Sequence, residues 1–207
     1  MKNMLYYEIK GLPVVIIDNF YDELAEEKIM QELLFLNNDP RKLKDGEHTG
    51  TAKDNVGNIL KNNKGLFLSD IYISEEYSNI LMESNKKLFH ESFHQNLEEK
   101  HSFFSYFSFM DKYETLISYY EKNDYYKQHS DKCIITAISW FYKTPKSFLG
   151  GDLIIENELK IECRKNRMLI FPSILKHEVT KIDMNMNTQL NNNGRFSITH
   201  FFHLGYQ

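Results

Sequence analysis

The spacing of apolar and polar residues changes near residue 102 and divides the chain into two parts. In the first part, residues 13–20 (PVVIIDNF) form an apolar, β-branched run that ends in turn residues, which predicts a strand. The stretch 21–36 has apolar residues at helical spacing and acidic residues early, which predicts a helix. A second helix is expected from about Ser74 to Glu99. The N-terminal part is therefore interpreted as two helices with a strand before them.

After residue 102 the pattern becomes one of short apolar runs separated by turn signals such as Thr144-Pro145, Gly150-Gly151 and Asn193-Gly194. About eight short strands within about 100 residues are typical of an antiparallel sandwich or barrel. We therefore predict a single α+β, mostly-β domain over residues 1–207, with residues 1–101 as helical support and 102–207 as the β core. The expected strands are FFSYFSF (103–109), TLISYY (115–120), CIITAISWFY (133–142), DLIIEN (152–157), LKIECR (159–164), RMLIFP (167–172), HEVTKI (177–182) and RFSITHFF (195–202).

Residues 37–65 interrupt the N-terminal part with a polar stretch rich in Gly, Asn and Lys. Its composition predicts a long exposed loop, and loops of that length often act as functional lids.

Composition narrows the class of protein. Aromatic residues make up 14% of the 207 residues and apolar residues 42%, which favours a packed, strand-rich protein over a disordered one. The net charge of −4 gives no sign of a nucleic-acid partner. Cys133 and Cys163 are too few for a disulfide framework and fit a reducing compartment. With neither a signal-peptide pattern nor a membrane-spanning run, a cytoplasmic protein without a membrane partner is expected.

The first candidate for chemistry is the pattern His-Glu-x-x-His at residues 90–94 (HESFH). On a helix it would bring His90 and His94 to one face, as in zinc metalloproteases. One protease group extends the motif with a glycine at position 97 and a histidine at position 100, where this chain has Leu97 and Lys100. Because a third ligand is missing, we interpret HESFH as a face of a supporting helix.

A second histidine pattern lies in a turn-like polar segment between two expected strands. His129 and Asp131 are two residues apart, so on an extended segment both side chains point to the same side. His177, at the start of a later strand, is the candidate third ligand. Two imidazoles and one carboxylate form the facial triad of non-haem Fe(II) oxygenases, which leaves coordination positions open. The sequence thus predicts a metal site of His129, Asp131 and His177.

The last expected strand supplies a cation for such a site. By strand alternation Arg195 and Thr199 share one face, whereas His200 faces the other way and is interpreted as structural. Arginine suits a bidentate contact with the far carboxylate of a dicarboxylic cosubstrate, and Thr199 can add a hydroxyl group.

In order and spacing these parts resemble the 2-oxoglutarate- and Fe(II)-dependent dioxygenases, and within them the prolyl-hydroxylase-like group. The resemblance covers roughly residues 13–205. Besides the entry stretch VVIIDNFYDE, it is carried by Tyr120 and residues 126–131 (YKQHSD), residues 148–153 (FLGGDL), 169–172 (LIFP), 177–179 (HEV) and 195–199 (RFSIT).

The resemblance implies a double-stranded β-helix, or jelly roll, with N-terminal helices packed against one sheet. It implies O2 as a second cosubstrate, ascorbate as a candidate reductant, and 2-oxoglutarate held at its distal carboxylate by Arg195. Family members often add a tyrosine hydroxyl near the cosubstrate. Tyr120 matches that position best and Tyr126 is nearby. The implied Fe(II) ligands are His129, Asp131 and His177.

Two features depart from the family pattern. Trp140 stands where prolyl hydroxylases commonly have a tyrosine that helps to bind the cosubstrate. The stretch 182–194 (IDMNMNTQLNNNG) looks like an inserted hairpin tip and lengthens the spacing between His177 and Arg195.

The resemblance favours hydroxylation of a prolyl residue in a protein or peptide, and the 37–65 loop is suited to fold over such a chain. Hydroxylation of a free amino acid or another small molecule on the same iron site stays open as the alternative. Oxidative dealkylation of nucleic acid is disfavoured, because enzymes of that kind have a second arginine where this chain has Phe201. An intact triad together with Arg195 argues against a catalytically silent binding module.

Overall fold

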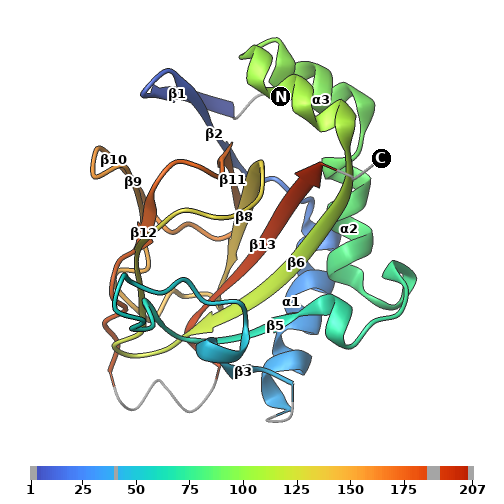
Figure 1. The fold of residues 1–207 in the computed structure, drawn as a ribbon. Helices are drawn as coiled ribbons and strands as arrows, with labels where there is room; N and C mark the ends of the chain where they lie inside the picture. The colour runs from blue at the N-terminus through green and yellow to red at the C-terminus, as the bar shows by residue number, and fades with distance from the viewer. Residues whose placement is uncertain (1–3, 40–41, 186–191, 205–207) are drawn as a thin grey trace.

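Strands dominate the computed structural model, which describes residues 4–39, 42–185 and 192–204 (Figure 1). The first half of the chain contains β1 (Met4–Ile9), β2 (Leu12–Asp18), α1 (Glu23–Asn38), β3 (Lys44–Asp45), β4 (Lys61–Asn62), β5 (Lys64–Phe67), α2 (Asn79–Leu88) and α3 (Glu91–Glu98), with short 3-10 turns η1 (Gly46–His48), η2 (Leu68–Asp70) and η3 (Glu75–Tyr77). The second half contains η4 (Ser102–Phe109), β6 (Met110–Tyr120), β7 (Tyr125–His129), β8 (Ile135–Phe141), β9 (Leu153–Ile155), β10 (Leu159–Ile161), β11 (Arg167–Pro172), β12 (His177–Val179) and β13 (Arg195–Leu204).

The strands form two antiparallel sheets. The larger has eight strands in the order β1-β2-β11-β8-β13-β6-β5-β3, and the smaller has five in the order β10-β9-β12-β7-β4. Neighbours in each sheet are often far apart in sequence: β13 lies between β6 and β8, and β11 between β2 and β8. The mostly-β jelly roll expected from the sequence is confirmed.

The larger sheet separates two hydrophobic cores. One core lies between this sheet and the helices, and the other between the two sheets. β13 contributes to both walls because its side chains alternate: Phe196 and Ile198 join the core under the helices, while Arg195 faces the other side. Helices α1 and α2 pack against the face of the larger sheet that points away from the smaller sheet, as Figure 1 shows. Because Arg195 faces the space between the two sheets, polar side chains can gather at one end of that space.

Helix α1 matches the predicted helix and anchors the helical layer. Asp22 caps its N-terminus by accepting a hydrogen bond from the Ala25 amide at 3.0 Å. From the third turn, the buried Glu32 carboxylate accepts hydrogen bonds from Ser78 Oγ at 2.8 Å and from the Ile80 amide at 2.9 Å. These bonds satisfy the first turn of α2, so the two helices are joined by polar contacts as well as by packing.

The predicted strand over residues 103–109 is wrong, because this segment forms the 3-10 helix η4. Its buried residues, Phe104 and Phe107, are three apart, which is the repeat of a 3-10 turn. The His101 side chain caps the turn by accepting a hydrogen bond from the Phe103 amide at 3.0 Å. In a run that is almost entirely aromatic, a period of two and a period of three cannot be told apart by hydrophobicity.

The second predicted helix is also wrong as a continuous element. It is divided into η3, α2 and α3, and α3 begins only at Glu91. His90 is the N-cap of α3, with an extended backbone at φ −75° and ψ 127°. Its Nδ1 accepts a hydrogen bond from Ser92 Oγ at 2.8 Å. HESFH therefore does not lie within one continuous helix, because α3 begins after His90.

The expected long exposed loop at 37–65 is only partly correct. The segment supplies edge strands to both sheets: β3 and β5 extend the larger sheet, and β4 pairs with β7 in the smaller one. Lys61 and Asn63 are buried as a result. Two-residue strands leave no periodic pattern in a sequence, which is why these pairings were missed. The strand β7 has five residues and was missed for a different reason, because it forms within the polar segment that looked turn-like. Within the described ranges, none of the helices combines the length and the apolarity needed to cross a membrane.

Candidate active site

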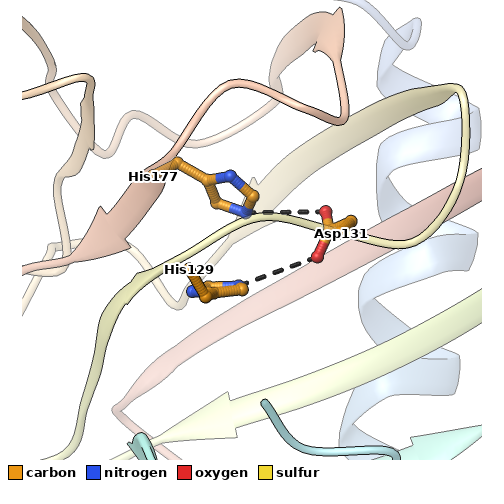
Figure 2. A group of neighbouring side chains, drawn as sticks. All are labelled: His129, Asp131 and His177. Atoms are coloured by element: carbon orange, nitrogen blue, oxygen red, sulfur yellow. Dashed lines mark ion pairs between the residues drawn. The ribbon is translucent and has the colours of Figure 1, made fainter. Parts of the chain in front are cut away.

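Three side chains of the smaller sheet meet at the mouth of the jelly roll (Figure 2). His129 ends β7 and His177 opens β12, and the antiparallel register sets these two residues opposite each other. Asp131 follows in the turn after β7, with its carboxylate oxygens 3.7 Å from His129 Nε2 and 3.5 Å from His177 Nε2. One ligand atom from each residue lies within 4.8 Å of the others. The structure thus brings together all three residues that the sequence suggested as metal ligands.

Both imidazoles are held in the form that binds a metal. His129 Nδ1 donates to the Lys127 carbonyl at 2.8 Å, and His177 Nδ1 donates to the Leu175 carbonyl at 3.0 Å. Because a carbonyl can only accept, Nδ1 carries the proton and Nε2 keeps its lone pair. Burial, and the neighbouring His177, lower the pKa of His129 to about 3, so its ring is neutral at physiological pH. The donor set fits a divalent transition metal.

The Asp131 carboxylate is oriented by neighbours that the sequence reading missed. Its Oδ2 accepts a hydrogen bond from Thr136 Oγ1 at 2.7 Å, and Thr136 is in turn 2.8 Å from Ser173 Oγ. The Asp131 amide donates to the Ser173 carbonyl at 3.0 Å. Thr136 and Ser173 come from β8 and from the turn after β11, inside or beside apolar runs, so no local pattern marked them.

A cavity of about 1090 Å³ opens between the two sheets and contains the triad. Its wall on the smaller sheet carries His129, Asp131 and His177. Its wall on the larger sheet carries alternate residues of β13, as strand alternation predicted. These are Arg195, Ser197, Thr199, Phe201 and His203.

Arg195 presents an unsatisfied cation to this cavity. Only 1% of the residue is exposed, yet its Nε and Nη1 have no hydrogen-bond partner among the described residues. Its guanidinium carbon lies 4.7 Å from the centre of the Tyr120 ring and 5.7 Å from that of Trp140. A buried charge without a counter-ion is costly, so an anionic ligand is the natural partner for these donors.

A glycine makes room for this arginine. Gly151 has a φ of +70°, and a Cβ added to it would lie only 2.7 Å from Arg195 Cδ. The Gly150-Gly151 turn therefore allows the guanidinium to lie against the backbone while its polar edge stays available.

The two tyrosines that the sequence suggested lie at different places in the cavity. Tyr120 pairs with Arg195 across β6 and β13 and lies beside its guanidinium. Tyr126 stacks on the His129 ring, with centroids 3.5 Å apart and planes 14° apart, and its hydroxyl accepts a hydrogen bond from the Ala52 amide at 3.1 Å. Tyr120 is therefore next to the buried Arg195, and Tyr126 is next to His129 of the candidate metal site.

The two histidines of HESFH have structural roles and do not form such a site. His90 is an exposed helix cap, and His94 stacks on Phe107 with ring centroids 4.8 Å apart. His94 Nε2 also makes a 2.5 Å hydrogen bond with the Leu88 carbonyl. Among the residues that the structure describes, the triad is the only group of three or more potential ligands close enough to share a metal.

The double variant His90→Ala, His94→Ala is therefore expected to keep its metal while losing about 1 kcal/mol of folding stability through the missing cap. Elemental analysis of the purified protein and urea unfolding measure the two effects. A fall in metal content in the double variant, with the fold intact, would show that HESFH takes part in metal binding.

His200 lies on the opposite face of β13 from Arg195, as alternation predicted. It is fully buried, its Nδ1 is 2.9 Å from Thr115 Oγ1, and its ring packs near Phe202. Burial lowers the pKa of His200 to about 3. The folded state keeps this ring neutral, whereas the unfolded chain protonates it below about pH 6.5.

This difference in protonation predicts that the free energy of unfolding decreases at acid pH. Between about pH 6.5 and pH 3 the unfolded state binds one more proton than the folded state, so stability falls as the pH falls through that window. His200→Gln should make the dependence shallower by up to about 1.4 kcal/mol per pH unit. Urea unfolding at a series of pH values measures it. Equal slopes for the variant and the original protein would mean that folding does not lower the pKa of His200.

Comparison with known proteins extends these observations. Residues 115–203, which include the triad and Arg195, match the 2OG-Fe(II) oxygenase superfamily. The fold is similar to a Pseudomonas putida prolyl-4-hydroxylase, with a TM-score of 0.62 at 14% identity over 93% of this chain and 92% of that one. It is also similar to a 2OG-Fe(II) oxygenase family protein from Burkholderia pseudomallei (TM-score 0.58, 13% identity, 93% and 86% covered).

A third similar structure is the viral collagen prolyl hydroxylase of Paramecium bursaria Chlorella virus-1 in its 2OG complex, with a TM-score of 0.52 at 12% identity over 91% of this chain and 94% of that one. No curated protein matches the chain. The resemblance inferred from the sequence is confirmed.

Proposed function

We propose that this 2OG-Fe(II) oxygenase hydroxylates prolyl side chains of a protein or peptide, with iron held by His129, Asp131 and His177. One observation carries the proposal. The His-Asp-His cluster and an unpaired, buried Arg195 face the same cavity from opposite sheets. This is the arrangement needed to hold a metal at one wall and the far carboxylate of a dicarboxylate at the other.

When bound, Fe(II) and 2-oxoglutarate would supply, together with O2, the oxidising power to insert one oxygen atom into a C–H bond, with release of succinate and CO2. The chain's own residues bind and orient. Nε2 of both histidines and the Asp131 carboxylate would supply three ligand atoms to a bound metal, and this donor set is the one that leaves coordination positions for cosubstrates. Arg195 and Thr199 offer donors for the distal carboxylate, and Tyr120 is in place to add its hydroxyl. Tyr126 holds the His129 ring by stacking.

Apolar side chains of the cavity keep water away from the reacting atoms. Ile138, Leu153 and Val179 line it between the two sheets. Excluding water strengthens the contacts of the charged groups and protects the oxidant from side reactions.

Two observations support a prolyl residue in a chain as substrate. The similar solved structures include two prolyl hydroxylases, one of them acting on collagen by its name. The cavity of about 1090 Å³ is also at the upper end of the range of small-molecule pockets, and its lining includes the segments 49–55 and 128–133, where a polypeptide has room to lie.

The substrate is tested by mass spectrometry after incubation with Fe(II), 2-oxoglutarate and isotopically heavy O2. Proline-containing peptides, proteins of a cell lysate and free amino acids are offered in parallel. We expect one heavy oxygen atom on a prolyl residue of a peptide or protein. Label found only on free proline or on another metabolite would replace the prolyl proposal with a small-molecule hydroxylase.

A further inference from the structure

A second buried cation, Lys61, lines the cavity near the triad. It lies on β4, where it pairs with Tyr126 of β7, and only 6% of the residue is exposed. Its Nζ lies 5.3 Å from the centre of the Tyr126 ring, which itself stacks on His129. Lys61 is thus connected to the metal-binding residues through a single aromatic side chain.

In the described part of the chain, the hydrogen-bond partners of Lys61 are neutral. Its ammonium group donates to Thr49 Oγ1 at 2.8 Å and makes a longer contact of 3.4 Å with the Thr49 carbonyl. No acid among the described residues forms an ion pair with it. Burial lowers the pKa of Lys61 to about 8, while the charge of Asp131 favours the protonated form. The group therefore remains mostly charged at neutral pH, and neutral threonine oxygens do not compensate that charge.

The charge balance of the loaded cavity leaves Lys61 without a counter-ion. Fe(II) brings two positive charges, of which Asp131 neutralises one, and Arg195 and Lys61 each add one. The two carboxylates of 2-oxoglutarate cancel two of the three charges that remain. Among these inner groups, Lys61 is therefore the one positive charge in excess.

The mouth of the same cavity also carries positively charged side chains, although the net charge of the protein is −4. Lys53, Lys132 and Lys176 are exposed and line the mouth from three different segments, the last two directly beside Asp131 and His177. None of the three forms an ion pair with a described acid.

The two other acids of the lining are already engaged within the protein. Asp54 accepts hydrogen bonds from the Val56 and Asn58 amides, and Glu114 pairs with His203 at 3.4 Å. The three lysines outnumber these two acids, so the charge that an incoming acid would meet at the mouth is positive on balance.

We propose that Lys61 is a specificity-determining residue that binds an acidic side chain of the substrate, so that the preferred substrate is an acidic segment of polypeptide. The inference rests on the proposed function and specifies its substrate class. The group that Lys61 binds is a carboxylate, which an acidic side chain of the substrate or the cosubstrate 2-oxoglutarate could supply. The experiment distinguishes these two sources.

The test uses a pool of short synthetic peptides, each with a central proline and one flanking Asp or Glu, and matched peptides with Asn or Gln at the same position. Immobilised protein loaded with Mn(II) and 2-oxoglutarate captures them without turnover, and mass spectrometry counts the bound peptides. The same pool is then offered with Fe(II) and O2 to measure hydroxylation. The affinity for 2-oxoglutarate is measured separately by calorimetry.

We expect the original protein to retain acidic peptides over their amide partners by about tenfold or more at one position, and Lys61→Met to lose that preference. Lys61→Arg should keep most of it. The affinity for 2-oxoglutarate should change by less than about twofold in Lys61→Met. Lys64→Met is the matched control, because Lys64 is exposed on β5, the next strand along the chain, and pairs with Glu121 outside the cavity.

Thermal unfolding separates binding from folding, because replacing an uncompensated buried charge with Met should leave stability unchanged or raise it. The inference is overturned if the original protein has no acid preference or if Lys61→Met keeps it. It is also overturned if Lys61→Met weakens 2-oxoglutarate binding about tenfold, because Lys61 then serves the cosubstrate. Acid-dependent capture without oxygen on proline would refute the prolyl substrate and leave the role of Lys61 standing. Proline hydroxylation without acid preference would do the reverse.

Discussion

Asp131→Ala should abolish turnover and weaken Fe(II) binding by more than about 100-fold, the upper end of what the loss of an outer partner of a ligand costs. Asp131 lies between the two histidines and offers one oxygen toward each Nε2. Without it the site retains two neutral imidazoles and loses its only negative charge. Titration of the apoprotein with Fe(II) under anaerobic conditions, followed by calorimetry, measures the change.

Two companion variants make this result specific. Thr136→Val removes the hydrogen bond to Asp131 Oδ2 and should cost about 10- to 100-fold in affinity, which is less than removing the ligand itself. Glu178→Gln changes a carboxylate beside His177 in sequence that does not line the cavity, and it should leave the affinity unchanged. Equal Fe(II) affinity in Asp131→Ala and the original protein would refute this carboxylate as a ligand.

Arg195→Met should raise the dissociation constant of 2-oxoglutarate by about 30-fold or more, as expected when one partner of a buried charge pair is removed. The same variant should be no less stable than the original protein without ligand, because the guanidinium is buried and two of its nitrogens find no partner in the described ranges. Calorimetric titration with 2-oxoglutarate in the presence of Mn(II), and thermal unfolding of the ligand-free protein, measure the two effects.

Arg167→Met is the matched control, because Arg167 is also buried but is already paired. Its Nε and Nη2 donate to the two oxygens of Asp18 at 2.5 and 2.9 Å. The control should lose stability and keep its affinity for 2-oxoglutarate, which is the opposite of the result expected for Arg195→Met. Unchanged binding in Arg195→Met would refute the assignment of Arg195 to the distal carboxylate.

The site residues that could be predicted from the sequence are those fixed by strand alternation and by short motifs. The register of β13 against β6 is regular from Arg195 to His203, so the opposite orientations of Arg195 and His200 follow from strand alternation. His129 and Asp131 are two residues apart, so their common orientation can be predicted from the sequence. The third partner cannot be fixed in this way, because it depends on which later strand lies beside them. The register of β12 against β7 brings His177 opposite His129.

The residues that were missed depend on contacts between distant segments. Lys61 lies in a polar stretch that reads as solvated, and its burial arises from the pairing of β4 with β7, more than 60 positions later in the chain. Thr136 and Ser173 meet Asp131 only because β8 and β11 are neighbours in the larger sheet. A period in the sequence reports which face of a strand a residue occupies, but not which strand comes next to it.

The most direct test of the central claim is the absorption spectrum of the protein with Fe(II) and 2-oxoglutarate in the absence of O2. If the triad binds iron and the cosubstrate chelates it, a weak charge-transfer band should appear in the visible range when both are added. The band should be absent in Asp131→Ala. A protein that gives no band, and forms no succinate when O2 and candidate substrates are supplied, would contradict the iron site described here.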